Sequence, residues 1–380
     1  MSPPAADATS SAPTPGSAPT ADAATTADPE PTPLEVSWFA ALCDDDVEQL
    51  GVPAPHLVSS FEHCRDIVLA ARDQGFDNIL LPSGYQLGID TLVFAGGVAP
   101  EVRGRMRLLA AVRCAEMWPP QLARQLATLD RMLDGGLTIN IISSDLPGAP
   151  LESEPRYRRT AEVMSILRQL LDGRPIEHHG EFFDLELEPP RIATLRGGCP
   201  PMYFGGHSEP ARCVAAEHAD VFLTWPDTEA AVSGLVTDMT GRAAAHSRTL
   251  RIGFRCHVIV RETEAEARAA ARHLLAKLDV EQGQKIRARS LDSGSAGVQR
   301  QAELRENSDD DGFVEEALWT GIGRARSGAG AAIVGDPDQV VAKLRRYQQL
   351  GVDAFILSGY PHLAECELVG RHVLPALRAG

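Results

Sequence analysis

Two ionisable side chains stand two residues apart in the apolar segment RIGFRCHVIV, residues 251–260. Successive side chains of a β-strand point to opposite faces, so Arg255 and His257 must share one face while Cys256 points to the other. Burying an arginine and a histidine together is costly unless a partner compensates for the lost hydration. The pair therefore indicates one of two arrangements. Either it forms a salt bridge on the outer face, or it lines a site where Arg255 holds an anionic group and His257 donates or carries a proton.

Other candidate residues stand where apolar segments end. Tyr360 follows the segment DAFIL in the sequence SGYPH, which places it at the end of a predicted strand. The junction GGHS, residues 205–208, lies between an apolar segment and a helical pattern, where free N–H groups and the helix dipole favour an anion such as a phosphate. The short donors and acceptors at these ends are Asn140, Ser143, Gly206, His207 and Ser208.

Composition excludes several classes of partner. The 380 residues carry 36 Lys and Arg against 52 Asp and Glu, a net charge of -16, with no basic cluster, so nucleic acid is not an expected partner. A small anionic substrate still fits wherever a few arginines converge. The seven cysteines are scattered without a CxxC pair, so we expect neither disulfides nor a metal site, and a reducing, cytoplasmic location.

The two ends of the chain differ in kind. Residues 1–33 contain no Lys or Arg and no apolar run, which lacks the marks of a signal peptide and predicts a disordered tail. No later stretch reaches the roughly 18 apolar residues that cross a membrane. Residues 34–380 are therefore expected to form one folded domain.

Within that domain, apolar segments alternate with amphipathic ones, which is typical of βα units with a parallel sheet. Eight such units predict an α/β fold, the (β/α)₈ TIM barrel, with its active site at the carboxyl ends of the strands. A doubly wound open sheet is the alternative. The predicted strands are 35–42, 77–82, 106–112, 137–142, 201–205, 220–224, 251–260 and 353–357, and the predicted helices are 59–74, 119–134, 156–171, 209–218, 228–247, 263–278 and 337–350.

Two stretches interrupt the alternation. Residues 174–200 predict an insertion with a small hairpin. Residues 280–312 are long, polar and poor in apolar side chains, which indicates either a disordered segment or a mobile active-site lid. The motifs GxxxxGK[ST], HExxH and GxSxG are absent, and the glycines of residues 321–330 do not stand between a strand and a helix. Phosphate-loop, zinc-hydrolase, serine-triad and Rossmann sites therefore lack support.

The segments MYFGGHSEPARCVAAEHADVFLTW, IGFRCHVIVRET, ARSGAGAAIVGDPDQV and FILSGYPHL resemble, in order and spacing, the alkanesulfonate monooxygenases within the bacterial-luciferase-like flavin-dependent monooxygenases. The resemblance runs from Val36 to Leu377. It implies a TIM barrel that takes reduced FMN (FMNH2) from a separate NAD(P)H-dependent flavin reductase and uses O2 as cosubstrate. In such a reaction the carbon–sulfur bond of an alkanesulfonate or related compound breaks to give an aldehyde and sulfite.

Matched position by position, the resemblance makes Arg255, His257, Arg326 and Tyr360 the catalytic residues, with Arg326 closing from the lid. Two arginines suit the oxygens of a sulfonate. The flavin phosphate is expected near Asn140, Ser143, Tyr157, Gly206, His207 and Ser208, where Tyr157 depends on the RYRR match alone. A homo-oligomer is also expected.

Two departures from the family pattern concern the catalytic face. Cys43 stands where the family has a histidine and is followed by Asp44, Asp45 and Asp46, while Gly88 or its neighbour stands where the family has a cysteine. Three acids at the mouth would repel a simple sulfonate unless they point outward. These departures keep three alternatives open: a luciferase-like monooxygenase acting on a non-sulfonate in a biosynthetic pathway, a deazaflavin-dependent oxidoreductase, and a flavin-binding protein without enzyme activity.

Overall fold

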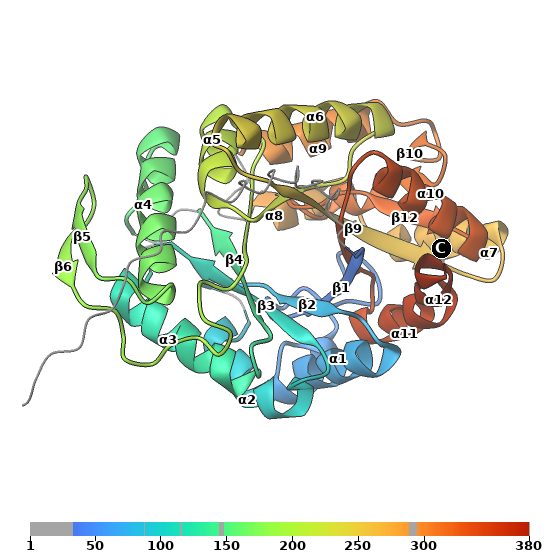
Figure 1. Cartoon of the computed structure of the whole chain (residues 1–380). Helices are drawn as coiled ribbons and strands as arrows, with labels where there is room; N and C mark the ends of the chain where they lie inside the picture. Colours follow the sequence, from blue (N-terminus) through green and yellow to red (C-terminus); the bar gives the residue numbers. More distant parts are fainter. Residues whose placement is uncertain (1–32, 87, 115, 144–147, 289–294, 380) are drawn as a thin grey trace, which may run out of the picture. The chain divides into compact units, whose positions relative to one another are not determined.

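A computed structural model describes residues 33–86, 88–114, 116–143, 148–288 and 295–379, so nearly all of the expected tail lies outside the described residues. Within this part of the chain, eight parallel strands close into a barrel, which confirms the TIM barrel (Figure 1). Closure is made by β9, which pairs with both β8 and β13. The barrel strands, in order around the sheet, are β1 (Glu35–Phe39), β2 (Asn78–Leu81), β3 (Arg107–Arg113), β4 (Leu137–Ile142), β7 (Met202–Gly205), β8 (Val221–Thr224), β9 (Arg251–Val260) and β13 (Ala354–Ser358).

Helices surround the barrel and bury their apolar faces against it (Figure 1). Three of them, α2, α11 and α12, are not among the predicted helices; the sequence of α2, TLVFAGGVAPEV, is apolar on all sides and so shows no helical period. The helices of the ring are α1 (Phe61–Gln74), α2 (Thr91–Val102), α3 (Pro119–Met132), α4 (Ser153–Leu171), α5 (Glu209–His218), α6 (Glu229–Ala245), α7 (Glu264–Leu275), α10 (Pro337–Gln349), α11 (His362–His372) and α12 (Leu374–Arg378). In the described part of the chain, no helix is both long enough and apolar enough to span a bilayer.

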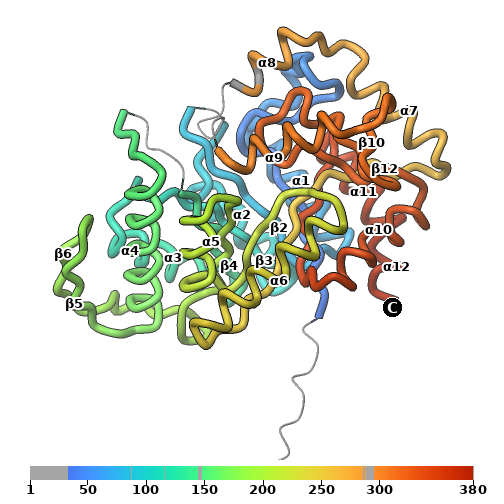
Figure 2. The backbone as a smooth tube through the Cα atoms, turned by 90° about the horizontal axis from the view of Figure 1, so that it is seen from above, coloured from blue at the N-terminus to red at the C-terminus, as the bar shows by residue number. Residues whose placement is uncertain are grey.

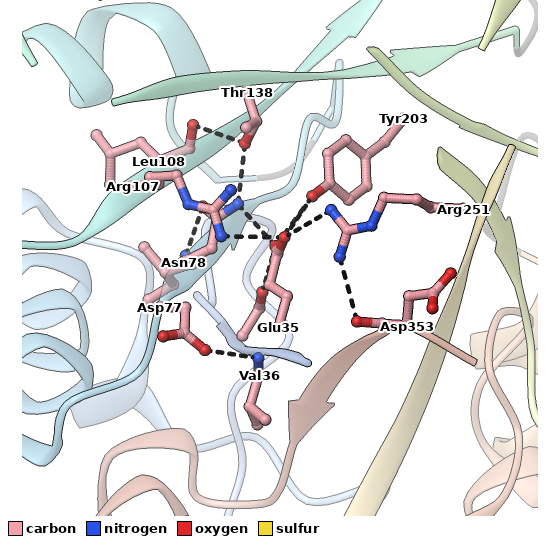
Figure 3. Close-up of polar contacts among 12 residues, drawn as sticks. Glu35, Val36, Asp77, Asn78, Arg107, Leu108, Thr138, Tyr203, Arg251 and Asp353 are labelled. Atoms are coloured by element: carbon pink, nitrogen blue, oxygen red, sulfur yellow. Dashed lines mark hydrogen bonds and ion pairs between the residues drawn. The ribbon is translucent and has the colours of Figure 1, made fainter. Parts of the chain in front are cut away.

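The amino-terminal end of the barrel is closed by a buried polar network around Glu35 (Figure 3). Glu35 is 3% exposed, accepts hydrogen bonds from Tyr203 Oη at 2.8 and 3.0 Å, and forms ion pairs with Arg107 at 3.0 Å and Arg251 at 3.6 Å. Burial would raise the pKa of Glu35, but these cations and hydrogen bonds outweigh it and lower the pKa. A charged network on this face of a TIM barrel serves stability, because the chemistry belongs to the opposite face.

The predicted hairpin within residues 174–200 is confirmed as β5 (Ile176–His179) paired antiparallel with β6 (Asp184–Leu187). A second extension was not predicted. The carboxyl half of β9 runs beyond β8 and pairs with β12 (Ala332–Gly335), which continues antiparallel into β11 (Leu318–Trp319) and β10 (Phe313–Glu315). This extension leads through the short 3-10 helix η2 (Gly321–Arg324) to Arg326.

The described part of residues 280–312 is not a disordered segment. It contains α8 (Val280–Ala288) and α9 (Ala296–Glu306), and residues 289–294 lie outside the described residues. Helix α9 is held by hydrogen bonds as well as by apolar contacts. Gln301 donates to the Pro226 carbonyl at 2.7 Å and accepts from the Gly330 N–H at 2.9 Å. Figure 2 shows α8 at the same end of the barrel as the loop that follows β1. That end carries the carboxyl termini of the strands.

Candidate active site

Arg255 and His257 share the inner face of β9, as their spacing predicts. The guanidinium of Arg255 lies 4.3 Å from the ring centroid of Phe39, which packs inside the barrel, and it donates to the Cys256 carbonyl at 2.9 Å. His257 Nδ1 lies 2.8 Å from Ser358 Oγ of the neighbouring strand β13. Among the described residues, Arg255 has no carboxylate ion pair, so the outer-face salt bridge is not formed.

Arg326 and Tyr360 join this pair from other parts of the chain. Arg326 Nη1 donates to Tyr360 Oη at 2.6 Å and to Asp45 Oδ2 at 2.6 Å. The ring of Tyr360 stacks on His257 with 5.2 Å between centroids and 25° between planes. The structure therefore brings the four predicted catalytic residues together at the carboxyl ends of β9 and β13.

Burial sets the protonation of this cluster. It lowers the pKa of Arg255 to about 10, with a further contribution from the charge of Arg326, so the guanidinium remains charged at neutral pH. Burial, then the two arginines, lowers the pKa of His257 well below its ordinary value, so the imidazole is neutral. Burial raises the pKa of Tyr360, which stays protonated. The cluster thus offers one desolvated cation pair and two neutral groups that can donate or accept a proton.

A second histidine reaches the cluster without having been predicted. His362 follows the cis Tyr360–Pro361 bond, and its ring lies 5.0 Å from Tyr360 in an edge-to-face arrangement. Asp46 Oδ1 accepts from both Nδ1 and the backbone N–H of His362 at 3.0 Å, and Asp46 Oδ2 lies 2.9 Å from His63 Nε2. A carboxylate on Nδ1 leaves Nε2 of His362 as the free acceptor. This Nε2 atom is buried and has no partner in the part of the chain that the structure describes.

The three acids that follow Cys43 do not form the repulsive patch that the sequence suggested. Asp44 accepts from the backbone N–H groups of Ser59 at 2.9 Å and Gly88 at 3.0 Å. Asp45 is paired with Arg326, and Asp46 holds His362. The three carboxylates therefore do not face the mouth as one unpaired patch, because each is directed to a protein donor.

The two family positions that differ in this sequence have distinct consequences. Burial, then Asp45, raises the pKa of the Cys43 thiol to about 12, so it is no thiolate at neutral pH. Gly88 has a φ of +79°, and a Cβ there would lie 1.7 Å from the Leu42 carbonyl oxygen. No side chain fits at position 88, so this position cannot supply the thiol that the family carries.

Four of the six residues expected around the flavin phosphate meet where β7 ends and α5 begins, with Tyr157 reaching there from α4. A Cβ on Gly206 would lie 2.6 Å from Ala211 Cβ and 3.4 Å from Tyr157 Oη, so glycine allows the backbone to enter α5 close beside the tyrosine. Ser208 is the N-cap residue of α5 but makes no capping bond. Its Oγ and the Nε2 of His207 are both buried without a partner within the described ranges. Orphaned donors at a helix N-terminus fit an anionic phosphate.

Two other predicted phosphate ligands lie differently. Asn140 pairs in register with Tyr203 and Ala111, both interior residues, so its side chain faces the inside of the barrel. Ser143 is tied to α4: its Oγ accepts from Thr160 at 2.8 Å. The structure thus groups Gly206, His207, Ser208 and Tyr157, and no hydrogen bond joins Asn140 or Ser143 to that group among the described residues.

Helix α9 packs over this second cluster. A Cβ on Gly297 would meet Trp225 at 2.8 Å and His207 Cδ2 at 3.2 Å, so α9 approaches the ends of β7 and β8 through its glycine. On the other side, a Cβ on Gly283 of α8 would lie 2.4 Å from the Arg324 carbonyl oxygen. Helix α9 therefore lies against the phosphate cluster and α8 against η2, which leads to Arg326, where the lid was expected.

Comparisons with known proteins agree with this geometry. The family description "luciferase-like monooxygenase" matches residues 37–354. The chain is 60% identical over 353 residues to a sulfoquinovose monooxygenase of Novosphingobium aromaticivorans, covering 91% of this chain and 97% of the relative. It is 54% identical over 347 residues to one of Agrobacterium fabrum, covering 90% of each. A riboflavin lyase crystallised with modified FMN and riboflavin shares the fold, with a TM-score of 0.76, 17% identity and coverage of 91% and 92%.

Proposed function

The chain belongs to the luciferase-like monooxygenase family, and we propose that it uses reduced FMN and O2 to release sulfite from a sulfonated sugar, with sulfoquinovose as substrate. Two relatives named for sulfoquinovose, at 54% and 60% identity over at least nine-tenths of this chain, support this choice over an alkanesulfonate. The proposed overall reaction is balanced: R–CH2–SO3⁻ + FMNH2 + O2 gives R–CHO + HSO3⁻ + FMN + H2O. For sulfoquinovose the aldehyde forms at C6, the carbon that bears sulfur.

The observation that carries the proposal is the charge of the catalytic cluster. Asp45 is paired with Arg326, whereas no carboxylate forms an ion pair with Arg255 among the described residues. Arg255 is therefore a desolvated cation to which a sulfonate monoanion would supply the missing negative partner. Arginine suits this ligand because its planar fork matches oxyanions in a fixed geometry.

Proton movement is assigned to His362, Tyr360 and His257. The reaction removes one hydrogen from the carbon that bears sulfur, so a base must stand beside that carbon. We assign the base to His362, whose Nε2 is free while Asp46 fixes Nδ1. Tyr360 and His257 are assigned to orienting the sulfonate and donating to oxygen, since both stay uncharged.

The cofactor is assigned to the second cluster. Gly206, His207, Ser208 and Tyr157 would hold the phosphate of FMN, which when reduced supplies the electrons that activate O2. Helix α9 would exclude water from the space between the clusters, which protects reactive species from hydrolysis. A separate NAD(P)H-dependent flavin reductase is the proposed partner, as the family resemblance implies.

The test combines the purified protein with a generic flavin reductase, FMN and NADH, and measures sulfite and oxygen consumption. We expect sulfite from sulfoquinovose in proportion to oxygen consumed, and at least about tenfold higher kcat/KM than with hexanesulfonate or octanesulfonate. Oxygen consumption without sulfite release from any sulfonate would overturn the proposal that the substrate is a sulfonate. Turnover with a reduced deazaflavin and no oxygen requirement would overturn the monooxygenase reaction itself.

A further inference from the structure

Asp45 differs from its two acidic neighbours in how its oxygens are used. Asp44 and Asp46 each engage both carboxylate oxygens with donors of the protein. Asp45 engages only Oδ2, which accepts from Arg326 at 2.6 Å. Its Oδ1 is buried and has no hydrogen-bond partner among the residues that the structure describes.

A buried carboxylate oxygen without a donor is expensive, because it has lost its hydration and gained nothing in return. Such an unpaired oxygen points to a donor that is supplied from outside the protein, such as a bound ligand. Oδ1 belongs to a carboxylate that shares Arg326 with Tyr360, so it lies one side chain away from the proposed sulfonate position. Both oxygens of a carboxylate are acceptors, so the missing partner must be a donor.

We infer that Asp45 is a specificity-determining residue whose Oδ1 accepts a hydrogen bond from a hydroxyl group of the substrate near its sulfonate. An alkanesulfonate has no such donor and would leave Oδ1 unsatisfied, which penalises it. In sulfoquinovose the hydroxyl nearest the C6 sulfonate along the carbon chain is that on C4. This inference rests on the proposed function and names the contact that separates a sugar sulfonate from an alkyl one.

The same contact accounts for the charge pattern. Arg326 could bind a sulfonate without any acid beside it, and an acid there weakens its grip on an anion. Asp45 therefore lowers the affinity for every sulfonate. Only a substrate with the hydroxyl group regains that affinity, through its hydrogen bond to Oδ1. Selectivity obtained by leaving a polar group unpaired against the wrong substrate is stronger than selectivity by shape alone.

The test compares sulfoquinovose with its 4-deoxy and 2-deoxy analogues in wild type, Asp45→Ala and Asp45→Asn. In wild type we expect kcat/KM to fall about 10- to 100-fold for the 4-deoxy compound, the value of a hydrogen bond to a charged group, and about twofold or less for the 2-deoxy compound. In Asp45→Ala the kcat/KM for sulfoquinovose, divided by the kcat/KM for its 4-deoxy analogue, should fall to about 1. Effects of the substitution on Arg326 act on both substrates and cancel in this ratio.

In Asp45→Asn this ratio of kcat/KM values should lie between those of wild type and Asp45→Ala, because a neutral amide makes a weaker hydrogen bond to the hydroxyl. Binding is read separately as the rise in melting temperature on adding each sugar to the enzyme with reduced FMN in the absence of oxygen. The exposed Glu48→Gln serves as the control that removes a negative charge near the same loop. It should leave the ratio unchanged.

The outcomes separate the two claims. Suppose that wild type releases sulfite from sulfoquinovose but Asp45→Ala lowers kcat/KM by the same factor for sulfoquinovose and its 4-deoxy analogue. The inference about Asp45 is then wrong and the proposed function stands. If wild type releases no sulfite from any sulfonate, the proposed function fails and this inference fails with it. Should Asp45→Ala not fold, the wild-type series still decides, since equal turnover of sulfoquinovose and its 4-deoxy analogue would overturn the contact.

Discussion

Replacing Arg255 with methionine should make the empty protein no less stable while it lowers turnover. Burial, followed by the charge of Arg326, lowers the pKa of Arg255 from 12.5 to about 10. At 1.36 kcal/mol per pKa unit, the folded state disfavours the charged form by roughly 3 kcal/mol. The sign follows directly: a cation with a depressed pKa destabilises the fold wherever it stays charged, which includes neutral pH.

Part of that cost is returned by two contacts. The guanidinium lies 4.3 Å from the Phe39 ring centroid, worth about 1–2 kcal/mol as a desolvated cation–π contact, and it donates to the Cys256 carbonyl. Methionine keeps the length and the contact with the ring without the charge. The expected net change for Arg255→Met is therefore between zero and about 2 kcal/mol of stabilisation, or up to about 3 °C in melting temperature at about 2.1 cal/mol/K of unfolding entropy per residue.

The effect on turnover should be opposite in direction. Loss of a charge-assisted hydrogen bond to the sulfonate costs about 1.5–3 kcal/mol, or roughly 10- to 150-fold in kcat/KM. Affinity for reduced FMN should change little, because the phosphate cluster lies at β7 and α5. The assays are thermal unfolding of the empty protein, sulfite release, and anaerobic flavin titration. Arg103→Met, at an arginine 57% exposed, is the control for loss of a positive charge.

A fall of several degrees in the melting temperature of Arg255→Met would refute the reasoning, since it would make Arg255 a structural cation. Unchanged kcat/KM would refute the assignment of Arg255 to the anion. Added sulfoquinovose should raise the melting temperature of wild type with reduced FMN more than that of the variant.

Three further substitutions test other parts of the molecule. Gly206→Val would clash with Ala211 and displace the start of α5 beside Tyr157, so it should weaken binding of reduced FMN about tenfold or more in anaerobic titration; an unchanged dissociation constant would place the phosphate elsewhere. Gly283→Val pushes α8 away from the carbonyl of Arg324 and should lower kcat for sulfite release several-fold with flavin affinity retained, and full activity would show that α8 does not support Arg326. Glu35→Gln should cost about 2–3 kcal/mol at pH 7, measured by denaturant unfolding. Because the pKa of Glu35 is lowered, its contribution is present above its unfolded pKa and disappears as the pH falls through the folded value, so the difference between wild type and variant should shrink as the pH falls below the ordinary pKa of glutamate.

The strands of the barrel were predictable because each is a short apolar run bounded by polar turns. Leu137–Ile142 and Arg251–Val260 were predicted to the residue. Helix α2 was missed because apolar residues on every side erase the helical period, and β12 because its four residues follow a glycine-rich stretch. The order of α8 and α9 could not be predicted from apolar content, since a missing side chain at Gly283 and Gly297 makes their close approach possible.

The candidate site divides in the same way. The spacing of Arg255 and His257 predicts their shared face, since alternation is a local rule of the strand. Arg326 could be proposed only through the family resemblance, because its approach depends on β10, β11 and β12 returning the chain to β9. His362 was missed although it stands two residues after Tyr360. His362 is a candidate base because Asp46 holds its Nδ1, and Asp46 lies 316 residues earlier in the chain. No local sequence pattern connects the two residues.

The three consecutive acids show why a charge count in sequence does not give the charge that a ligand meets. Asp44 takes a left-handed backbone conformation with φ of 50°, which turns the chain between it and its neighbours. Asp44 then ties the loop to Gly88, Asp45 meets Arg326, and Asp46 meets His362, so each of the three carboxylates has a different protein partner. The contact with Asp44 is made by the backbone N–H of Gly88, a residue whose φ of +79° suits glycine. We therefore attribute the proposed change of substrate to the loops after β1 and β2, while Arg255, Arg326 and Tyr360 remain the residues proposed to bind the sulfonate.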